Sequence, residues 1–433
     1  MAKSTETSTT TTKARIGTKG AAAAAPRVSA LTRARSALKT VLKEDLVVPL
    51  SLDMLKETIP HIPTGSIVID FAIGGKINKH GIAPCPGIPR GRITQLYGAN
   101  SAGKTTLALT IAASVCANGG TVCYIDWEHE VEPRYAESLG VPIGDDSKFI
   151  LIQPNTLEEG MKTMIVMISE GVDLIVLDSV GAGKPEKQVN QSLDEVGEQD
   201  RPGRVAAAWS DFLPKVKGQM ASSNSTILAI SQMRKTMSSM SGGGPDSAPQ
   251  GGEAWKFFTS LRLSLRVLQK EKGKVFDPLT NKMEDKVTGT IVVLKLDKNK
   301  VSDSAHNEFK YYMTAGLGID NARSVAELAA SYKIVNKSGS WLEWPSGPNG
   351  PVKVQGMAQF LKILREDPKL LAALFAQVTP KIMAAPPVIL DTDAAETIDT
   401  DELMAMVDSI GSGGPRKALA EAMAEAEETD ASE

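Results

Sequence analysis

Residues 93–118 have the sequence ITQLYGANSAGKTTLALTIAASVCAN, and this stretch decides the fold. The apolar run Ile93–Tyr97 predicts a short strand, and Lys104–Asn118, rich in Ala, Leu and Thr, predicts a helix. Between them, Gly98–Thr105 matches the phosphate-binding loop, and both flanks have the required structure. Glycines in such a loop let main-chain N–H groups and the helix N-terminus face an anion. The stretch therefore predicts a nucleotide site where the strand meets the helix.

Two side chains of the loop and one distant carboxylate complete the predicted site for phosphate and metal. Lys104 would bring a positive charge to the β- and γ-phosphates, and Thr105 would offer its hydroxyl to Mg²⁺. Asp178 ends the apolar strand LIVLD, where a carboxylate can hold Mg²⁺ through water. The candidate nucleotide-binding residues of the loop are Gly98, Ala99, Asn100, Ser101, Ala102, Gly103, Lys104, Thr105 and Thr106.

Strands and helices alternate on both sides of this loop. Buried strands are predicted at Thr121–Asp126, Asp173–Asp178 and Thr226–Ser231, and helices at Leu157–Glu170 and Val205–Ser222. This alternation predicts an α/β fold, the core of a P-loop ATPase, with a mostly parallel sheet and helices on both faces. Ligands of such sheets bind at the carboxyl ends of the strands. We therefore expect functional side chains directly after the strands.

The ends of two strands carry candidates for the hydrolysis of a bound nucleotide. Glu128 follows the strand Thr121–Asp126 by two residues and could orient and polarise a water molecule. Spacing alone leaves Asp126 and Glu130 as competitors for that role. Gln232 closes the strand ILAIS and is the next polar group at this edge, where it could sense the γ-phosphate or be a plain surface amide.

Composition sets broad limits on the class of protein. Of the 433 residues, 42% are hydrophobic and 23% charged, as in ordinary soluble globular proteins, and no apolar run is long enough to cross a bilayer. The cysteines Cys85, Cys116 and Cys123 are too few and too unevenly spaced for a disulfide framework or a zinc site. A reducing compartment fits this cysteine content.

Charge is concentrated at the two ends of the chain. Residues 1–43 carry nine Lys or Arg and one acid, whereas residues 391–433 carry thirteen Asp or Glu and two basic residues. Such ends are typical of a protein that binds a polyanion and competes for its own basic surface, although two solvated tails would have the same composition. The low-complexity start lacks amphipathic periodicity, which favours a flexible tail over an organelle transit peptide.

The pattern divides the chain into five segments. Residues 29–43 form an amphipathic helix that needs a surface on its own core or on a neighbouring subunit, with Ser29 as its N-cap. Residues 319–378 have helical patterns near Ser324–Tyr332 and Val354–Asp367. The expected segments are a disordered basic tail at 1–28, an N-terminal helix and polymerisation segment at 29–59, the ATPase core at 60–318, a small α/β C-terminal domain at 319–385 and a disordered acidic tail at 386–433.

Several motifs in this order resemble those of the bacterial RecA recombinases. They are GSIVIDFAIGG, GRITQLYGANSAGKTTL, YIDWEHEVEPRYAESLGV, LIVLDSV, ISQMRK, GGEAWKFFTSLRLSLR and KLDKNKVSD. The similarity extends from about Thr64 to the helix near Gln377, and SGSWLEW and GMAQFLKILREDP resemble that family's small C-terminal domain. The motifs fit a cellular and a phage-encoded member equally. The segment Lys76–Pro89 is similar to nothing in the family pattern and is expected to be an insertion.

The resemblance implies roles around the nucleotide. Glu128 falls on the family's catalytic glutamate, so the resemblance favours Glu128 over Asp126 as the residue that orients water. Tyr135 falls on the tyrosine that stacks on adenine, and Glu132 takes the place of an aspartate near the base. Gln232 falls on the glutamine that couples the γ-phosphate to a DNA-binding loop. With Lys104 on the phosphates, Glu128 and Gln232 are the expected catalytic residues.

The resemblance also implies a subunit interface. Lys298 and Lys300 fall on two lysines that reach the ATP of the neighbouring subunit, although composition alone suggests a solvated strand end. Phe257 falls on an interface phenylalanine that relays the ATP signal between subunits; plain core packing would be the simpler interpretation.

Two loops are expected to contact DNA, at residues 195–204 and 235–252. The candidate DNA-binding residues are Arg204, Arg234, Met237, Met240 and Lys256. The basic ones would meet phosphates without reading sequence. The second loop departs from the family by carrying methionines and no phenylalanine, and the first has Pro202 and Arg204 where an apolar wedge is usual. Stretching of DNA would then depend on the two methionines, or be weaker.

Together these motifs imply a filament-forming, DNA-dependent ATPase of the cytoplasm that uses ATP and Mg²⁺ and pairs homologous strands in recombination and repair. Its partners would be single-stranded DNA, duplex DNA and further copies of itself, with single-strand-binding and loader proteins as candidates and no membrane. Two alternatives remain open, a ring-forming helicase of the same ATPase superfamily and a DNA-binding regulatory module that has lost turnover. The latter would not need Lys104, Thr105, Glu128 and Asp178, all of which are present.

Overall fold

The computed structural model describes residues 30–42, 54, 56–74, 82–189, 203–235, 247–277, 281–302 and 308–384. The chain forms two compact units, Met1–Glu57 and Thr58–Glu433. In the first unit, helix α1 (Ala30–Leu42) has the extent expected for the amphipathic segment, and its residues 31–41 are exposed. Ser29, the basic start and the acidic tail lie outside the described residues. Among the described residues, no helix is both long and apolar enough to span a membrane.

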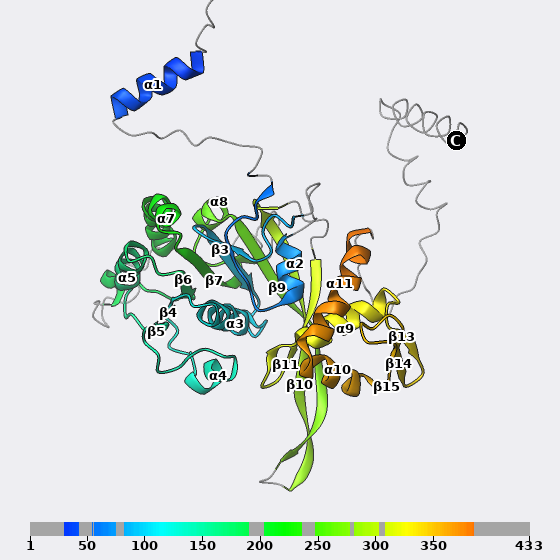
Figure 1. Ribbon diagram of the computed structural model, residues 1–433. Helices are drawn as coiled ribbons and strands as arrows, with labels where there is room; N and C mark the ends of the chain where they lie inside the picture. Colours follow the sequence, from blue (N-terminus) through cyan, green and yellow to red (C-terminus); the bar gives the residue numbers. More distant parts are fainter. Residues whose placement is uncertain are drawn as a thin grey trace, which may run out of the picture. The chain divides into compact units, whose positions relative to one another are not determined.

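The second unit is built on a ten-stranded sheet (Figure 1). Its strand order is β12-β11-β10-β9-β3-β7-β6-β4-β5, with β8 on β7. The strands are β3 (Ile93–Gly98), β4 (Val122–Asp126), β5 (Phe149–Ile152), β6 (Leu174–Asp178), β7 (Thr226–Lys235), β8 (Ser247–Pro249), β9 (Leu261–Asp277), β10 (Lys282–Asn299), β11 (Glu308–Thr314) and β12 (Gly318–Ile319). The pairs from β9 through β3, β7, β6 and β4 to β5 are parallel. The carboxyl ends of β3, β4, β6 and β7 therefore meet at one edge of the sheet.

Helices cover both faces of this sheet. On one face, α2 (Ile67–Gly74) and α3 (Lys104–Ala117) contribute to a core with Leu96, Tyr124 and Leu228. On the other face, α5 (Leu157–Ser169), α7 (Arg204–Ser223) and α8 (Ala254–Phe258) pack on Ile125 and Ile227. Two further helices are α4 (Pro133–Ser138) and α6 (Glu186–Val189). Because a parallel sheet is apolar on both sides, it requires this double cover, and the predicted α/β class is confirmed.

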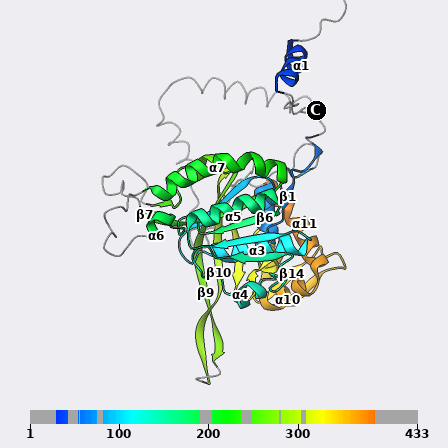
Figure 2. The same cartoon turned by 90° about the vertical axis from the view of Figure 1, so that its left-hand side faces the viewer.

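The strands β9 and β10 are much longer than the predicted Leu261–Leu268 and Thr288–Leu296. The two strands pair antiparallel along their whole length, with some register shifts, from Leu261 opposite Asn299 to Asp277 opposite Lys282. The ribbon that they form extends away from the helices (Figure 2). The outer half is rich in Lys, Glu and Asp, and most of the side chains described there are exposed, so it has no apolar alternation to mark it as strand. The predicted insertion lies elsewhere: its described part carries β2 (Ile88–Pro89), which pairs with β1 (His61–Ile62).

The residues after β12 form a small module with its own core. It contains α9 (Asn321–Ser331), a sheet of β13 (Asn336–Ser338), β14 (Trp341–Trp344) and β15 (Val352–Gln355), α10 (Met357–Glu366) and α11 (Pro368–Ala384). The predicted helix from Val354 was wrong at its start, because residues 352–355 are a strand and Gly356, at φ +81°, separates it from α10. Phe71 of α2 packs edge-on against Phe375 of α11, with ring centroids 5.9 Å apart.

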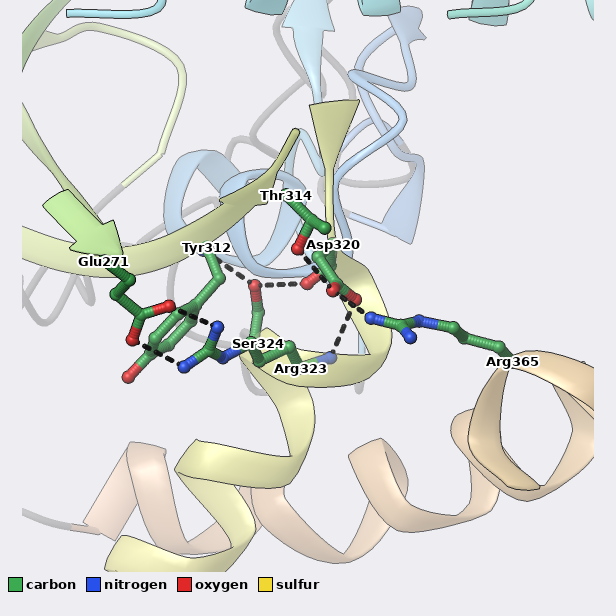
Figure 3. A network of polar contacts seen from close by, with 7 residues as sticks. All are labelled: Glu271, Tyr312, Thr314, Asp320, Arg323, Ser324 and Arg365. Atoms are coloured by element: carbon green, nitrogen blue, oxygen red, sulfur yellow. Dashed lines mark hydrogen bonds and ion pairs between the residues drawn. The ribbon is translucent and has the colours of Figure 1, made fainter. Parts of the chain in front are cut away.

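A polar network joins this module to the long ribbon (Figure 3). Asp320 caps α9 by accepting from the Arg323 N–H, and it also accepts from Thr314 Oγ1 at 2.9 Å and from Arg365 of α10. Arg323 in turn makes two hydrogen bonds, 2.5 and 2.7 Å, to the carboxylate of Glu271 on β9. Asp320 is buried, and the hydrogen bonds that it accepts offset the cost of burying its charge.

Candidate nucleotide site

The phosphate-binding loop lies between the end of β3 and the start of α3, as the sequence predicted. Gly103 has φ +87° at the N-cap of α3, a conformation that favours glycine. A Cβ at Gly98 would lie 2.3 Å from the carbonyl oxygen of Leu265, so this position also tolerates no side chain. The two glycines let the backbone turn tightly and bring the first N–H groups of α3 to the edge of the sheet.

Lys104 faces the carbonyl groups of the loop. Its ammonium donates to the carbonyl oxygens of Ala99 at 2.9 Å and Gly98 at 3.2 Å. Burial lowers the pKa of this ammonium, and the charges of Asp178 and Glu128 oppose that effect. A buried cation held by neutral carbonyls gains strongly from an anion placed beside it. Lys104 is therefore well situated to bind phosphate.

Asp178 and Thr105 meet at the end of β6. The Thr105 hydroxyl donates to Asp178 Oδ2 at 3.1 Å, and the hydroxyl of Tyr124 donates to the same oxygen at 2.6 Å. Burial, together with the nearby charge of Glu128, raises the pKa of Asp178 to about 6, and the hydrogen bonds oppose that rise. Hard oxygen donors of this kind fit Mg²⁺, whose charge would favour the ionised carboxylate. Mg²⁺ usually keeps several waters and binds through one or two protein groups together with phosphate.

The three carboxylates after β4 have different surroundings. Asp126 is buried, and its two oxygens accept from the N–H groups of Glu128, His129 and Val131 and from Gln153 Nε2, so it shapes the turn. Glu130 is exposed.

Glu128 hydrogen-bonds to a residue just after β6 and to a residue on β7. Its Oε1 accepts from Ser179 Oγ at 2.7 Å and from Gln232 Nε2 at 2.6 Å. The structure thus brings together Glu128 and Gln232, which are 104 positions apart in the chain. The sequence analysis missed Ser179 and Tyr124, although a hydroxyl directly after Asp178 was a usable signal.

Tyr135 and Glu132 lie at the start of α4. The Glu132 carboxylate caps this helix, because its Oε2 accepts from the Tyr135 N–H at 2.6 Å. That hydrogen bond occupies an oxygen of the side chain that was expected near the nucleotide base. The Tyr135 hydroxyl is 2.7 Å from Thr106 Oγ1, so the exposed ring is fixed beside the first turn of α3. That position suits a ring that stacks on the base of a nucleotide whose phosphates lie in the loop.

Lys298, Lys300 and Phe257 form a separate group at the ends of β10 and α8. The Phe257 side chain is 72% exposed. The Lys298 ammonium donates to the carbonyl oxygens of Lys256 and Phe257. Its pKa is lowered by burial and by the nearby charges of Lys300, Arg262 and Lys217. Because the Lys298 ammonium points to α8 and not to the phosphate-binding loop of its own chain, any phosphate that it binds would have to come from elsewhere.

The comparison with known proteins decides the family. The sequence profile of the RecA N-terminal domain matches residues 30–319. The chain belongs to the RecA family. It is similar to a Protein RecA of Thermus thermophilus, with 34% identity over 349 residues, which is 79% of this chain and 92% of the relative. Protein RecA of Pseudomonas fluorescens is 32% identical over 357 residues, covering 82% and 92%, and that of Xanthomonas euvesicatoria is 32% identical over 337 residues, covering 77% and 88%.

Membership of the RecA family confirms three expectations. The resemblance seen in the motifs is correct, and so is the RecA-like core fold. The chain acts in ATP-dependent DNA recombination and repair, a function that fits these relatives better than a ring-forming helicase or a non-hydrolysing module does.

The loops that a RecA-family protein would use for DNA fall largely outside the described residues, as do Met237 and Met240. Arg204 is the first residue of α7, and Arg234 lies on β7 opposite Ala248. Lys256 of α8 pairs with Glu253 at 2.6 Å. At the edges of the predicted second loop, β7 extends to Lys235 and residues 247–249 form β8 beside it.

Proposed function

We propose that this RecA-family chain is a DNA-dependent ATPase that hydrolyses ATP to ADP and phosphate with Mg²⁺ and assembles as a helical filament on single-stranded DNA in the cytoplasm. The observation that carries the proposal is the hydrogen bond from Gln232 to Glu128, at 2.6 Å, beside the phosphate-binding loop. It joins the candidate base for hydrolysis to the strand that leads into the second DNA loop. The same filament would pair with homologous duplex DNA and exchange strands.

The residues at the strand ends would share the work of hydrolysis. Lys104 would bind the phosphates, and Thr105 and Asp178 would hold Mg²⁺, which when bound neutralises charge on the phosphates. Ser179 and Gln232 hold Oε1 of Glu128. Its Oε2 is then the oxygen that would orient a water molecule and accept the proton that the water loses.

Gln232 would act as the switch between nucleotide and DNA. Its side-chain amide binds Glu128, while its main-chain oxygen accepts from the N–H of Gln250, just after β8. A γ-phosphate next to Glu128 would compete for the amide and so shift the end of β7 relative to β8. A ligand that favours one of two arrangements in this way changes their populations. DNA bound at the second loop would favour the same arrangement.

The exposed group at Phe257, Lys298 and Lys300 would complete the site of the neighbouring subunit. An exposed aromatic ring and two cations without a carboxylate partner among the described residues are suited to an interface that contains phosphate. Tyr135 would stack on adenine and Glu132 would cap its helix. Duplex DNA would be a second nucleic-acid partner, and single-strand-binding and loader proteins are candidates.

The test measures phosphate release by the full chain with and without single-stranded DNA, and images the same samples by electron microscopy. We expect hydrolysis to rise with DNA and helical filaments to form with a non-hydrolysable ATP analogue. Closed rings would favour the helicase, and DNA binding without hydrolysis would favour the regulatory module.

A further inference from the structure

Three of the five tryptophans pack together on the face of the sheet covered by α5, α7 and α8. They are Trp127, directly after β4, Trp209 of α7 and Trp255 of α8, here called the tryptophan cluster. The Trp209 ring centroid lies 4.9 Å from that of Trp255, at an interplanar angle of 64°, and 6.2 Å from that of Trp127, at 89°. Trp209 and Trp255 are fully buried, and Trp127 nearly so. Edge-to-face contacts of this kind have a defined geometry.

Hydrogen bonds attach the tryptophan cluster to the end of β6. Trp209 Nε1 donates to the carbonyl oxygen of Val180 at 2.9 Å, one residue after Ser179, which binds Glu128. The main-chain N–H of Trp127 donates to the carbonyl oxygen of Asp178 at 2.8 Å. Trp209 is therefore connected to the backbone that positions Ser179, and Trp127 directly precedes Glu128 in the chain.

Glycines make room for these indoles. A Cβ at Gly160 would lie 2.0 Å from Trp127 Cζ2, and one at Gly183 would lie 3.1 Å from Trp127 Nε1. A Cβ at Gly251, just after β8, would lie 2.7 Å from Trp255 Nε1. The indoles are thus tightly packed against these glycines, and a close-packed interior transmits displacement instead of absorbing it.

The tryptophan cluster touches each element that the proposed function requires to communicate. Trp209 is in the second turn of α7, which starts directly after the first predicted DNA loop. Trp255 is in α8, which follows the second predicted DNA loop and carries Phe257. Trp127 adjoins the candidate catalytic glutamate. A shift of either helix would therefore reach the nucleotide edge through aromatic contacts.

We propose that Trp209 is a positioning residue that couples DNA bound near α7 and α8 to the placement of Glu128 by way of Val180, Ser179 and Trp127. This rests on the proposed function, because it concerns the dependence of hydrolysis on DNA. Since coupling between two sites is reciprocal, nucleotide bound at the loop also changes the environment of the tryptophan cluster.

The test compares Trp209→Phe and Trp255→Phe with the wild type in the full chain. Trp209→Phe keeps an aromatic ring but loses the hydrogen bond to Val180. Trp255→Phe is a smaller change than Trp209→Phe because it breaks no hydrogen bond: Trp255 Nε1 has no hydrogen-bond partner among the described residues. The matched control is Trp344→Phe, which removes an equally buried indole whose Nε1 donates to Gln377 at 3.0 Å in the C-terminal module. The readout is the ratio of DNA-stimulated to unstimulated hydrolysis, a ratio that loss of stability alone does not move.

We expect the ratio to fall at least about fivefold in Trp209→Phe, the lower range of allosteric coupling, and less in Trp255→Phe, with no change in Trp344→Phe. A ratio that is unchanged in both cluster variants would overturn the proposal, as would an equal fall in Trp344→Phe. If Trp209→Phe does not fold, the ratio of Trp255→Phe is compared with that of Trp344→Phe, and an unchanged ratio in Trp255→Phe then overturns the proposal.

A second measurement separates this proposal from the proposed function. In a chain carrying Trp341→Phe and Trp344→Phe, all tryptophan emission comes from the tryptophan cluster. We expect a non-hydrolysable ATP analogue with Mg²⁺ to change this emission relative to ADP. If DNA does not stimulate hydrolysis by the wild type, the proposed function is wrong. The tryptophan emission still tests whether nucleotide changes the environment of the tryptophan cluster. Identical spectra with the analogue, with ADP and without nucleotide would overturn the coupling.

Discussion

At the scale of single residues, neighbouring carboxylates have different roles because of the hydrogen bonds that they accept. Asp126 is closer to the end of β4 than Glu128, but four N–H donors already satisfy its oxygens. Glu128 accepts two hydrogen bonds, from Ser179 just after β6 and from Gln232 on β7, and both are to Oε1. Free acceptor capacity at the edge of the sheet, and not distance along the chain, therefore favours Glu128 as the base.

A prediction at this scale concerns Glu128→Gln. The amide keeps the shape of the side chain but cannot accept a proton, so we expect ATP to bind and hydrolysis to fall at least about 100-fold. The matched control is Glu130→Gln, two residues away on the exposed side of the turn, which should hydrolyse ATP at a rate near that of the wild type. Nucleotide binding and phosphate release are measured separately. If binding and hydrolysis were lost together in Glu128→Gln, Glu128 would be structural.

At the scale of elements, α2 carries a carboxyl group, Asp70, whose ionised form is disfavoured by burial. Asp70 accepts from the Thr64 N–H at 2.8 Å, but burial raises the pKa of Asp70 to about 6, above its usual 3.8. The folded state then binds the proton more tightly than the unfolded state does. Stability is therefore lost as the pH rises from about 4 towards 6, and the loss is complete above that range.

We therefore expect Asp70→Asn, which keeps the acceptor for Thr64 and cannot ionise, to be more stable than the wild type at pH 7.5. The gain should be on the order of 3 kcal/mol, since each pKa unit corresponds to about 1.4 kcal/mol, and it should shrink towards pH 5. Urea denaturation at several pH values measures it, with Asp146→Asn, an exposed carboxylate, as the control for lost charge. A difference that is independent of pH would show that burial of the charge is not the cause.

At the scale of the whole molecule, the proposed function requires each chain to contribute side chains to two nucleotide sites, its own and that of a neighbouring subunit. The ammonium of Lys104 binds the carbonyls of its own loop, whereas that of Lys298 binds the carbonyls of Lys256 and Phe257. Burial, and then the charges of Lys300, Arg262 and Lys217, lower the pKa of Lys298. Such a cluster gains stability when an anion approaches, and in a filament the neighbouring subunit would supply it.

We expect Lys298→Ala to fold and to lower DNA-stimulated hydrolysis by about 100-fold, the effect of removing one charge-stabilising donor. Mixing it with Lys104→Ala should restore part of the rate, because some interfaces then combine an intact loop with an intact Lys298. The control is Lys295→Ala on the same strand, an exposed lysine paired with Asp297 at 3.1 Å. Full activity of Lys298→Ala, or no rescue in the mixture, would refute action across the interface.

The sequence by itself determined the phosphate-binding loop, the strands and helices around it and the α/β class. These depend on residues that are neighbours in the chain, so glycine spacing and apolar periodicity are sufficient to predict them. The cap of α4 by Glu132 is also a local contact, to the N–H three residues further on. The place of Ser179 beside Glu128 and the tryptophan cluster were decided only by the tertiary structure, because residues far apart in the chain meet there. The outer half of β9 and β10 was missed for a related reason: backbone pairing extends strands whose exposed, charged side chains have no apolar pattern.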